Sequence, residues 1–247
     1  SRILTEMAVG SDPMAILRGE SSSFGAGGSL RAAVLGVNDG LVSNFSLVMG
    51  VAGGTGNADF VLLAGVAGLF AGAFSMAAGE YISMRSQRDI YEFELAKERI
   101  ELIEWPEEEL EELELIYQAK GLSPEEASTV AHRVMADPEG ALDTMAREEL
   151  GLDPSELGSP KGAAAASFLA FVGGALVPIA PYLLQAGDMA FSLSAGLSAA
   201  ALLIVGSTLA SMSGRPAWWG GLRMLLAGGA AASVTYGIGS LVGIPLG

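Results

Sequence analysis

The middle of the chain carries glutamates at spacings of three and four residues on both sides of Pro106. They are Glu94, Glu98 and Glu101 before the proline and Glu108, Glu109 and Glu112 after it. Residues at these spacings share one face of a helix, and a short turn at the proline allows two such faces to oppose each other. Like charges so placed cost about 0.2–0.5 kcal/mol per pair unless a cation is bound. The pattern therefore predicts either a solvated acidic face or a site for Fe, Mn, Zn or Ca.

Two further residues bear on the choice between these interpretations. Met145 precedes Glu149 by four residues, so a thioether and a carboxylate share a helix face, although a methionine there also suits a hydrophobic core. A thioether ligand favours a softer divalent ion over Mg²⁺ or Ca²⁺. His132 has no carboxylate three residues before it, so the Glu-x-x-His pairs typical of di-iron proteins are absent, and we interpret it as a surface or packing residue.

Three potential cation ligands lie in apolar stretches of the sequence. Asp39 is in the first such stretch, and Met76 and Glu80 are one turn apart in the second. Placing an ionised acid at the centre of a bilayer costs at least about 2.5 kcal/mol, so such acids face a pathway, a partner charge or a bound cation. These residues are candidate ion ligands. The alternative for Met76 is packing against lipid or another helix, and that for Glu80 is an interfacial acid paired with Arg31 or Arg85.

The chain consists of apolar regions and one acidic region between them. A mean hydropathy of +0.45 coexists with a net charge of −15, because most acids fall within residues 88–159 while 30–86 and 162–246 hold few. A sequence pI near 4.3 argues against nucleic acid as a partner, since phosphates would be repelled, and favours metal cations. The absence of cysteine excludes disulfides, thiolate metal sites and iron–sulfur clusters.

Five apolar stretches are near the roughly 20 residues that a bilayer requires. They are 31–53, 58–86, 162–185, 189–212 and 218–244. Lys and Arg are missing from the loops after the first and third stretches and from the C-terminus. Because cytoplasmic loops are rich in these residues, we expect a cytoplasmic N-terminus and acidic region and a luminal or extracytoplasmic C-terminus.

Proline and capping residues divide the acidic region into several predicted helices. One continues from the second span to about Trp105, and Pro106 suits the first position of the next. Ser123 and Glu126 form a capping-box pattern, and Pro138 begins a further helix. The sequence thus predicts an all-α membrane protein of five transmembrane helices, with a cytoplasmic helical metal-binding domain between spans 2 and 3. Its parts are an N-terminal segment with a flexible Ser/Gly stretch (1–29), spans 1–2 (30–87), the acidic domain (88–160) and spans 3–5 (161–247).

Two long sequence segments resemble those of a known protein family. RAAVLGVNDGLVSNFSLVMGVAGG and AGAFSMAAGEYISMRSQRD resemble the first two spans of the VIT/CCC1 family of vacuolar iron transporters, and the similarity extends over about residues 30–244. It implies a homodimer in the lipid membrane, with an ion pathway at its two-fold interface, that exchanges cytosolic Fe²⁺ for protons. The resemblance places the pathway at Asp39, Met76 and Glu80. It places the cytoplasmic metal site at Glu98, Glu101, Glu109, Glu112, Met145 and Glu149.

The expected function is therefore divalent metal/proton antiport by a secondary transporter, not an enzyme. A buried acid can hold either a proton or a metal ion, which is the minimum chemistry for exchange. Fe²⁺ is the expected cargo, with Mn²⁺, Zn²⁺ and Co²⁺ as further candidate ions, and the membrane is a vacuolar or a bacterial inner membrane. The alternatives are a membrane-anchored metal-binding or sensing protein that transports nothing and a di-iron oxidase, which the missing Glu-x-x-His pairs disfavour.

Overall fold

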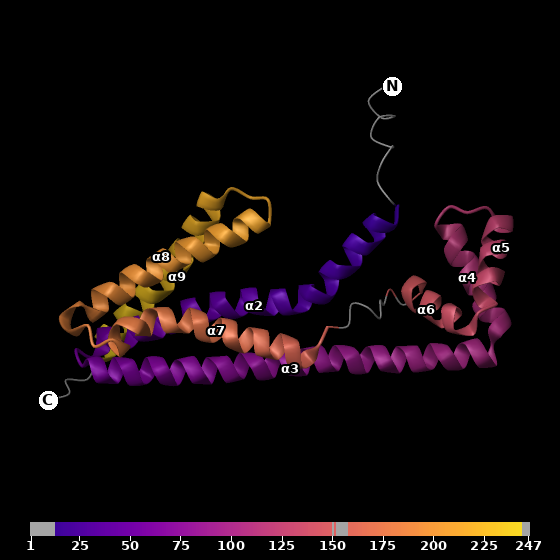
Figure 1. Ribbon diagram of the computed structural model, residues 1–247. Coiled ribbons are helices and arrows are strands. Elements are labelled where there is room, and N and C mark those ends of the chain that lie inside the picture. Colours follow the sequence, from indigo (N-terminus) through magenta and orange to yellow (C-terminus); the bar gives the residue numbers. More distant parts are fainter. Residues whose placement is uncertain (1–12, 150, 152–157, 244–247) are drawn as a thin grey trace, which may run out of the picture. The chain divides into compact units, whose positions relative to one another are not determined.

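A computed structural model describes residues 13–149, 151 and 158–243, with side chains from residue 28 onward. The described residues contain helices and no strand (Figure 1). The helices are α2 (Pro13–Gly54), α3 (Ala58–Glu104), α4 (Pro106–Ala119), α5 (Pro124–Met135), α6 (Pro138–Glu148), α7 (Pro160–Leu183), the 3₁₀ turn η2 (Gly187–Met189), α8 (Ala190–Met212) and α9 (Ala217–Val242). Residues 1–12 of the predicted N-terminal segment and position 244 of the predicted fifth span lie outside the described residues.

Contacts divide the chain into two compact units. The membrane unit comprises Gly27–Ile82 and Ser159–Gly247, and the acidic unit comprises Ser1–Ala26 and Ser83–Gly158. Helix α3 contributes residues to both units, because no proline or glycine interrupts it between Gly79 and Glu104.

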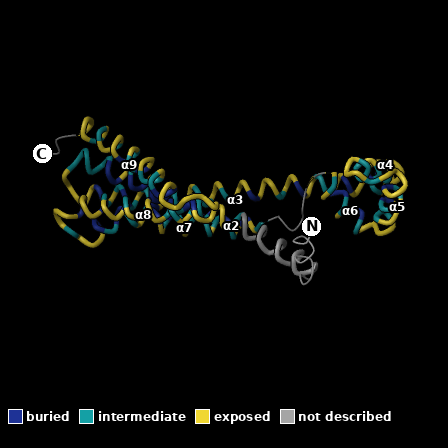
Figure 2. Tube along the Cα trace, turned by 90° about the horizontal axis from the view of Figure 1, so that it is seen from above, coloured by how far each residue is buried: buried dark blue, intermediate teal, exposed yellow. Residues whose placement is uncertain are grey.

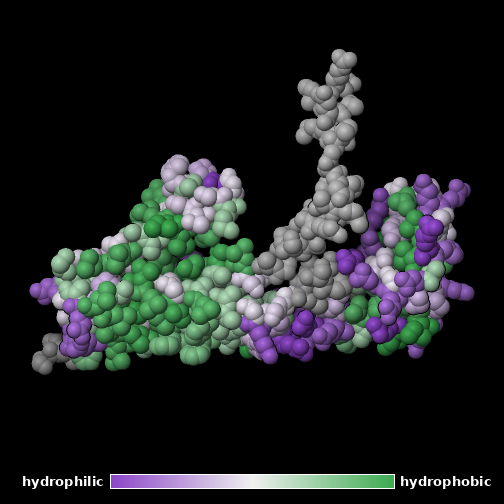
Figure 3. Space-filling view, in the orientation of Figure 1, coloured by the Kyte–Doolittle hydropathy of each residue, from purple (hydrophilic) through white to green (hydrophobic). Residues whose placement is uncertain are grey.

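The membrane unit contains the predicted apolar spans. Five helices in the described residues are long and apolar enough to cross a bilayer, which confirms the number expected from the sequence. Large apolar side chains such as Leu63, Phe74, Leu169 and Leu226 are 61–68% exposed, and Figure 3 shows the resulting hydrophobic surface over this unit. A soluble protein rarely exposes so continuous an apolar surface, so these side chains are suited to contact lipid.

Small residues let the helices of this unit approach closely. A Cβ added at Gly36 would lie 2.6 Å from the carbonyl oxygen of Ser167, so α2 and α7 are in backbone contact there. At Gly206 it would lie 2.5 Å from the Gly220 oxygen, where α8 meets α9. Because lipid supplies no hydrophobic force between helices, association depends on this packing and on interhelical hydrogen bonds.

Hydroxyl groups supply two of those interhelical bonds. Ser194 Oγ in α8 donates to the Pro178 oxygen of α7 at 2.6 Å, and Thr235 Oγ1 in α9 donates to the Ser46 oxygen of α2 at 2.7 Å. The core of the unit lies between α2, α3, α7, α8 and α9, with side chains such as Leu41 and Leu202 fully enclosed. These contacts fix the helix faces that carry the candidate ligands.

The start of α2 differs from the sequence-based expectation. The Ser/Gly stretch 21–29, predicted to be a flexible connection, lies inside a helix that begins at Pro13 and runs for 42 residues. The prediction of flexibility was wrong because it weighed composition alone. Glycine costs about 1 kcal/mol relative to alanine in a helix but does not stop one, and an established helix extends cheaply when no proline interrupts it.

The acidic unit forms as its capping signals predict. Pro106, Pro124 and Pro138 each occupy the first turn of a helix. The capping box is confirmed: Ser123 Oγ accepts from the backbone of Glu126, whose carboxylate accepts from the Ser123 N–H at 2.9 Å. Leu113, Ala131 and Met145 are fully buried and hold α4, α5 and α6 together. Figure 2 colours buried positions of these helices dark blue.

Candidate metal centre and ion pathway

Three glutamates converge in the acidic unit. Ligand oxygens of Glu98, Glu109 and Glu149 all lie within 4.8 Å of one another. Glu98 comes from α3, Glu109 from the first turns of α4, and Glu149 from the C-cap of α6. The helix is interrupted at Trp105 and α4 begins at Pro106, and this change of direction brings Glu109 close to Glu98. The third carboxylate, Glu149, comes from a helix later in the sequence.

The position of Glu98 and Glu109 is unusual for acids. Their exposed fractions are 2% and 7%, and carboxylates are rarely so buried without a partner. Burial, reinforced by the charges of Glu149 and Glu109, raises the pKa of Glu98 to about 8. Burial and the neighbouring charge of Glu149 raise the pKa of Glu109, and burial with the charge of Glu112 raises that of Glu149. In the absence of a cation Glu98 therefore retains its proton near neutral pH.

One proton has a defined place in the cluster. A hydrogen bond between Glu98 and Glu149 raises the pKa of the first and lowers that of the second, so protonated Glu98 is the donor. Glu109 also accepts a hydrogen bond from Glu98. Apart from the carboxyl groups of this cluster, buried Glu98 Oε1 and Glu109 Oε2 have no hydrogen-bond donor among the described residues. Unpaired carboxylate oxygens that converge from different helices fit a divalent cation, which would compensate both charge and lone pairs.

The remaining predicted ligands surround this centre. Glu101 forms an ion pair with Lys97 at 3.2 Å, and Glu112 is exposed; the charges of both act on the pKa of Glu109. Met145 is fully buried against Leu113, as its alternative interpretation as a core residue anticipated. Thus the structure brings three of the predicted carboxylates into one cluster and places Glu101 and Glu112 close enough to act on its charge.

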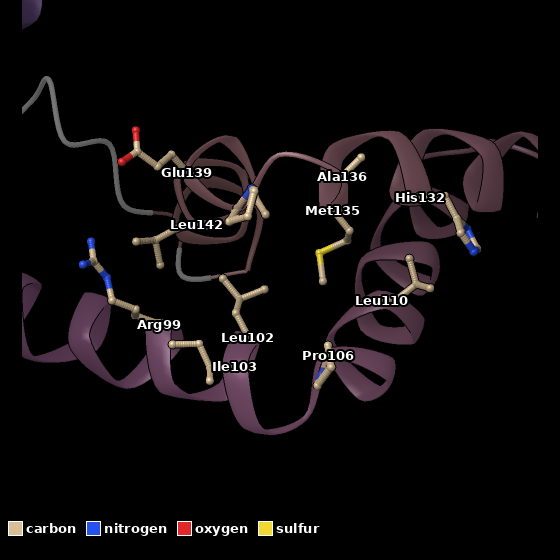
Figure 4. Close-up of a pocket in the computed structure, with 12 residues that line it drawn as sticks. Arg99, Leu102, Ile103, Pro106, Leu110, His132, Met135, Ala136, Glu139 and Leu142 are labelled. Atoms are coloured by element: carbon tan, nitrogen blue, oxygen red, sulfur yellow. The ribbon is translucent and has the colours of Figure 1, made fainter.

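An apolar cavity of about 540 Å³ in the same unit is separate from these acids. In Figure 4, Arg99 and Glu139 lie at one edge, His132 lies at the other, and Leu102 and Met135 lie between. His132 is 63% exposed in its side chain and donates from Nδ1 to the Ser128 oxygen at 2.9 Å. This agrees with its interpretation as a surface residue and gives it no place among the clustered carboxylates.

In the membrane unit, Asp39 lies in an open groove of about 260 Å³ between α2, α3 and α7. The groove is lined by Asp39, Ser43, Asn44, Leu47, Gly68, Gly72 and Phe171. Asn44 is the residue that sequence reasoning missed. The sequence does contain a sign of it, because an amide within the largely apolar run 41–51 requires a polar partner.

The other two predicted pathway residues have different surroundings. Met76 is partly buried and packs against the hydrophobic core of the unit. Glu80 is 12% exposed in its side chain and pairs with Arg31 at 3.6 Å, which is the alternative interpretation of this acid. Arg85 instead pairs with Asp89 at 2.8 Å. The ion pair ties α2 to α3 near the end of their apolar portions.

Comparison with known proteins adds an independent observation. The model of the VIT family matches residues 30–240. A vacuolar iron transporter of Acanthamoeba castellanii is 39% identical over 225 residues, covering 89% of this chain and 81% of its own. Vacuolar iron transporter 1 of Oryza sativa subsp. japonica is 32% identical over 220 residues (89% and 87%), and that of Eucalyptus grandis is 33% identical over 227 residues (90% of each).

Proposed function

The chain belongs to the VIT family, and on this premise we propose that it transports iron across a membrane, as Fe²⁺ moving from the cytosol to a vacuole-like lumen or the exterior in exchange for protons. The names of its relatives support iron as the cargo. The observation that carries the proposal is the cluster of Glu98, Glu109 and Glu149, whose buried unpaired oxygens suit a cation, in a chain with five helices able to cross a bilayer.

The acidic unit would collect the ion on the cytoplasmic side. Glu98, Glu109 and Glu149 supply the central oxygens, Glu101 and Glu112 supply further negative charge, and the Met145 thioether favours Fe²⁺ over harder cations such as Ca²⁺. Because the pKa of Glu98 is raised to about 8, this acid holds a proton when the site is empty, and binding of the ion displaces it. The same competition lets a change in pH release the ion.

The membrane unit would provide the route. Asp39 and Met76 are the proposed pathway ligands, and a homodimer with its two-fold axis beside them would present each ligand twice. Asp39 is exposed in the single chain, as a residue at such an interface would be. Glu80 would lie at the entrance, where its ion pair with Arg31 must open before its carboxylate can bind a cation.

Proton exchange would follow from the same carboxylates. In the homodimer, the two Asp39 carboxylates would together balance the charge of Fe²⁺, and two protons would neutralise the same pair after the ion leaves. Both states avoid the cost of an uncompensated charge in lipid. An acidic lumen favours the protonated form and so the release of the ion there. Mn²⁺, Zn²⁺ and Co²⁺ are competing cargoes to be tested, because their ligand preferences overlap with those of Fe²⁺.

The test is metal and proton flux in proteoliposomes. With an acidic interior, the wild-type chain is expected to take up Fe²⁺ and release protons, and Asp39→Ala is expected to abolish both. Asp59→Ala is the matched control, since Asp59 is an exposed acid at the start of α3 and does not line the groove. Full flux in Asp39→Ala would remove Asp39 from the pathway, and metal binding without any wild-type flux would identify a membrane-anchored binder instead.

A further inference from the structure

Asn44 lies in the groove that contains Asp39, and its side chain is only half satisfied. The residue is 2% exposed, and its Nδ2 donates to the Ala175 oxygen of α7 at 2.8 Å. Its Oδ1 is buried and has no hydrogen-bond partner in the part of the chain that the structure describes. A flipped amide would set Oδ1 against the Ala175 oxygen, so the bond to Ala175 fixes the orientation. The unpaired atom is therefore the oxygen.

This arrangement is costly, and α3 preserves it. A buried acceptor without a partner costs about 1–3 kcal/mol. Gly68 faces it: a Cβ at that position would lie 2.9 Å from Asn44 Oδ1, so any larger residue would press against the oxygen and occupy the space beside it. Glycine in a helix also costs about 1 kcal/mol relative to alanine. Both features reduce stability, and both leave the amide oxygen beside the groove without a partner.

We propose that Asn44 Oδ1 is a ligand for the divalent cation after it leaves Asp39. The inference rests on the proposed transport function and adds a second site to its route. Asn44 follows Asp39 by five residues, which is about 7.5 Å along the axis of α2. An amide oxygen is a hard, neutral ligand for a divalent cation. It attracts the ion less than a carboxylate does, and a transit site must bind weakly enough to release.

The first experiment exchanges the oxygen for sulfur in the full chain. In proteoliposomes, Asn44→Cys is expected to lower Fe²⁺ uptake by about tenfold, the lower end of the effect of disturbing a metal's ligand environment. It is also expected to raise the ratio of Cd²⁺ to Mn²⁺ uptake, because a thiolate prefers the softer ion. Ser46→Cys is the matched control, since Ser46 Oγ bonds within its own helix and does not line the groove.

Asn44→Asp separates a ligand from a structural amide. Both variants remove the Nδ2 donor to Ala175, but only aspartate keeps an oxygen in place. Retained Fe²⁺ uptake in Asn44→Asp together with the altered selectivity of Asn44→Cys supports the proposal. Equal losses in both variants with unchanged ion selectivity would overturn it and assign Asn44 to packing, as would wild-type uptake in Asn44→Cys. Absence of metal flux in the wild type would overturn the proposed function, and this inference with it.

A second variant reaches the same oxygen without altering Asn44. Gly68→Ala places a methyl group over Oδ1, while the other close atom, Leu47 Cδ2, is the end of a flexible side chain. We expect slower Fe²⁺ uptake with a thermal midpoint close to that of wild type. Gly229→Ala is the control, because a Cβ there meets nothing within 4 Å. Equal uptake by Gly68→Ala and Gly229→Ala would contradict access of the ion to Asn44.

Discussion

Replacement of Glu98 by glutamine tests the proton that the acidic cluster holds. Glutamine has nearly the shape of a protonated glutamate, and its amide can donate to Glu149 as protonated Glu98 does. The variant therefore mimics the empty, protonated cluster but cannot ionise. Because Glu98 is 2% exposed, an apolar or smaller residue would instead leave a cavity or an unpaired oxygen on its neighbours.

The sign of the effect on stability follows from the direction of the pKa shift. The pKa of Glu98 rises from 4.5 to about 8 on folding, so the folded chain binds this proton more tightly than the unfolded chain does. The resulting stabilisation is complete below about pH 4.5 and is lost as pH rises toward 8. At about 1.4 kcal/mol for each pH unit, raising the pH from 4.5 to 7 removes roughly 3 kcal/mol in wild type. Glu98→Gln cannot ionise at this position and does not lose this stabilisation.

The assay is thermal unfolding of the metal-free full chain in detergent, followed by tryptophan fluorescence. Trp105, at the junction of α3 and α4, reports on the acidic unit. For a domain of this size 1 kcal/mol shifts the midpoint by about 4–8 °C. We expect the wild-type midpoint to fall by more than about 10 °C between pH 5 and pH 8, and that of Glu98→Gln to fall clearly less. Glu109 and Glu149, whose pKa values are also raised, account for the slope that remains.

The affinity for metal should rise with pH, whereas the stability of the metal-free chain falls. In wild type, Fe²⁺ must displace the Glu98 proton, so its affinity is expected to increase by up to about tenfold for each pH unit between 5 and 8. Glu98→Gln is expected to bind at least about tenfold more weakly at pH 7.5 and to release about one proton fewer, measured by calorimetry in buffers of different ionisation enthalpy. Glu104→Gln, an exposed acid on the same helix, is the control. Identical pH slopes in wild type and Glu98→Gln would refute the protonated cluster.

Three further changes test other parts of the structure. Ser123→Ala removes a capping box with Glu126 and is expected to destabilise the acidic unit by about 1 kcal/mol, seen as a lower unfolding midpoint; no change would mean that the cap contributes nothing. Met145→Leu should cost less than about 1.5 kcal/mol in stability because volume is conserved, yet weaken Fe²⁺ but not Ca²⁺ binding in titrations; equal Fe²⁺ affinity would confine Met145 to packing. Gly40→Ala would overlap the Phe171 carbonyl where α2 meets α7, and should lower yield and midpoint strongly, whereas wild-type behaviour would show that these helices can separate.

The sequence by itself determined the number of spans and the helices of the acidic unit. Apolar length specifies a transmembrane helix because lipid offers no partner to the backbone, and this is a local property that a single sequence displays. Proline positions and the Ser123–Glu126 capping box likewise fix helix starts by local chemistry. Local signals failed only where composition was ambiguous, in the Ser/Gly stretch of α2 that proved helical.

Only the tertiary structure decided which of the spaced acids share a site. Spacing placed Glu101 and Glu112 on the same faces as Glu98 and Glu109, but burial and the arrival of Glu149 from α6 selected the three that converge. Burial depends on residues distant in sequence, and so do the raised pKa of Glu98, the pairing of Glu80 with Arg31, and the unpaired oxygen of Asn44. Sequence reports which groups can bind a cation, whereas packing decides which of them lack any other partner.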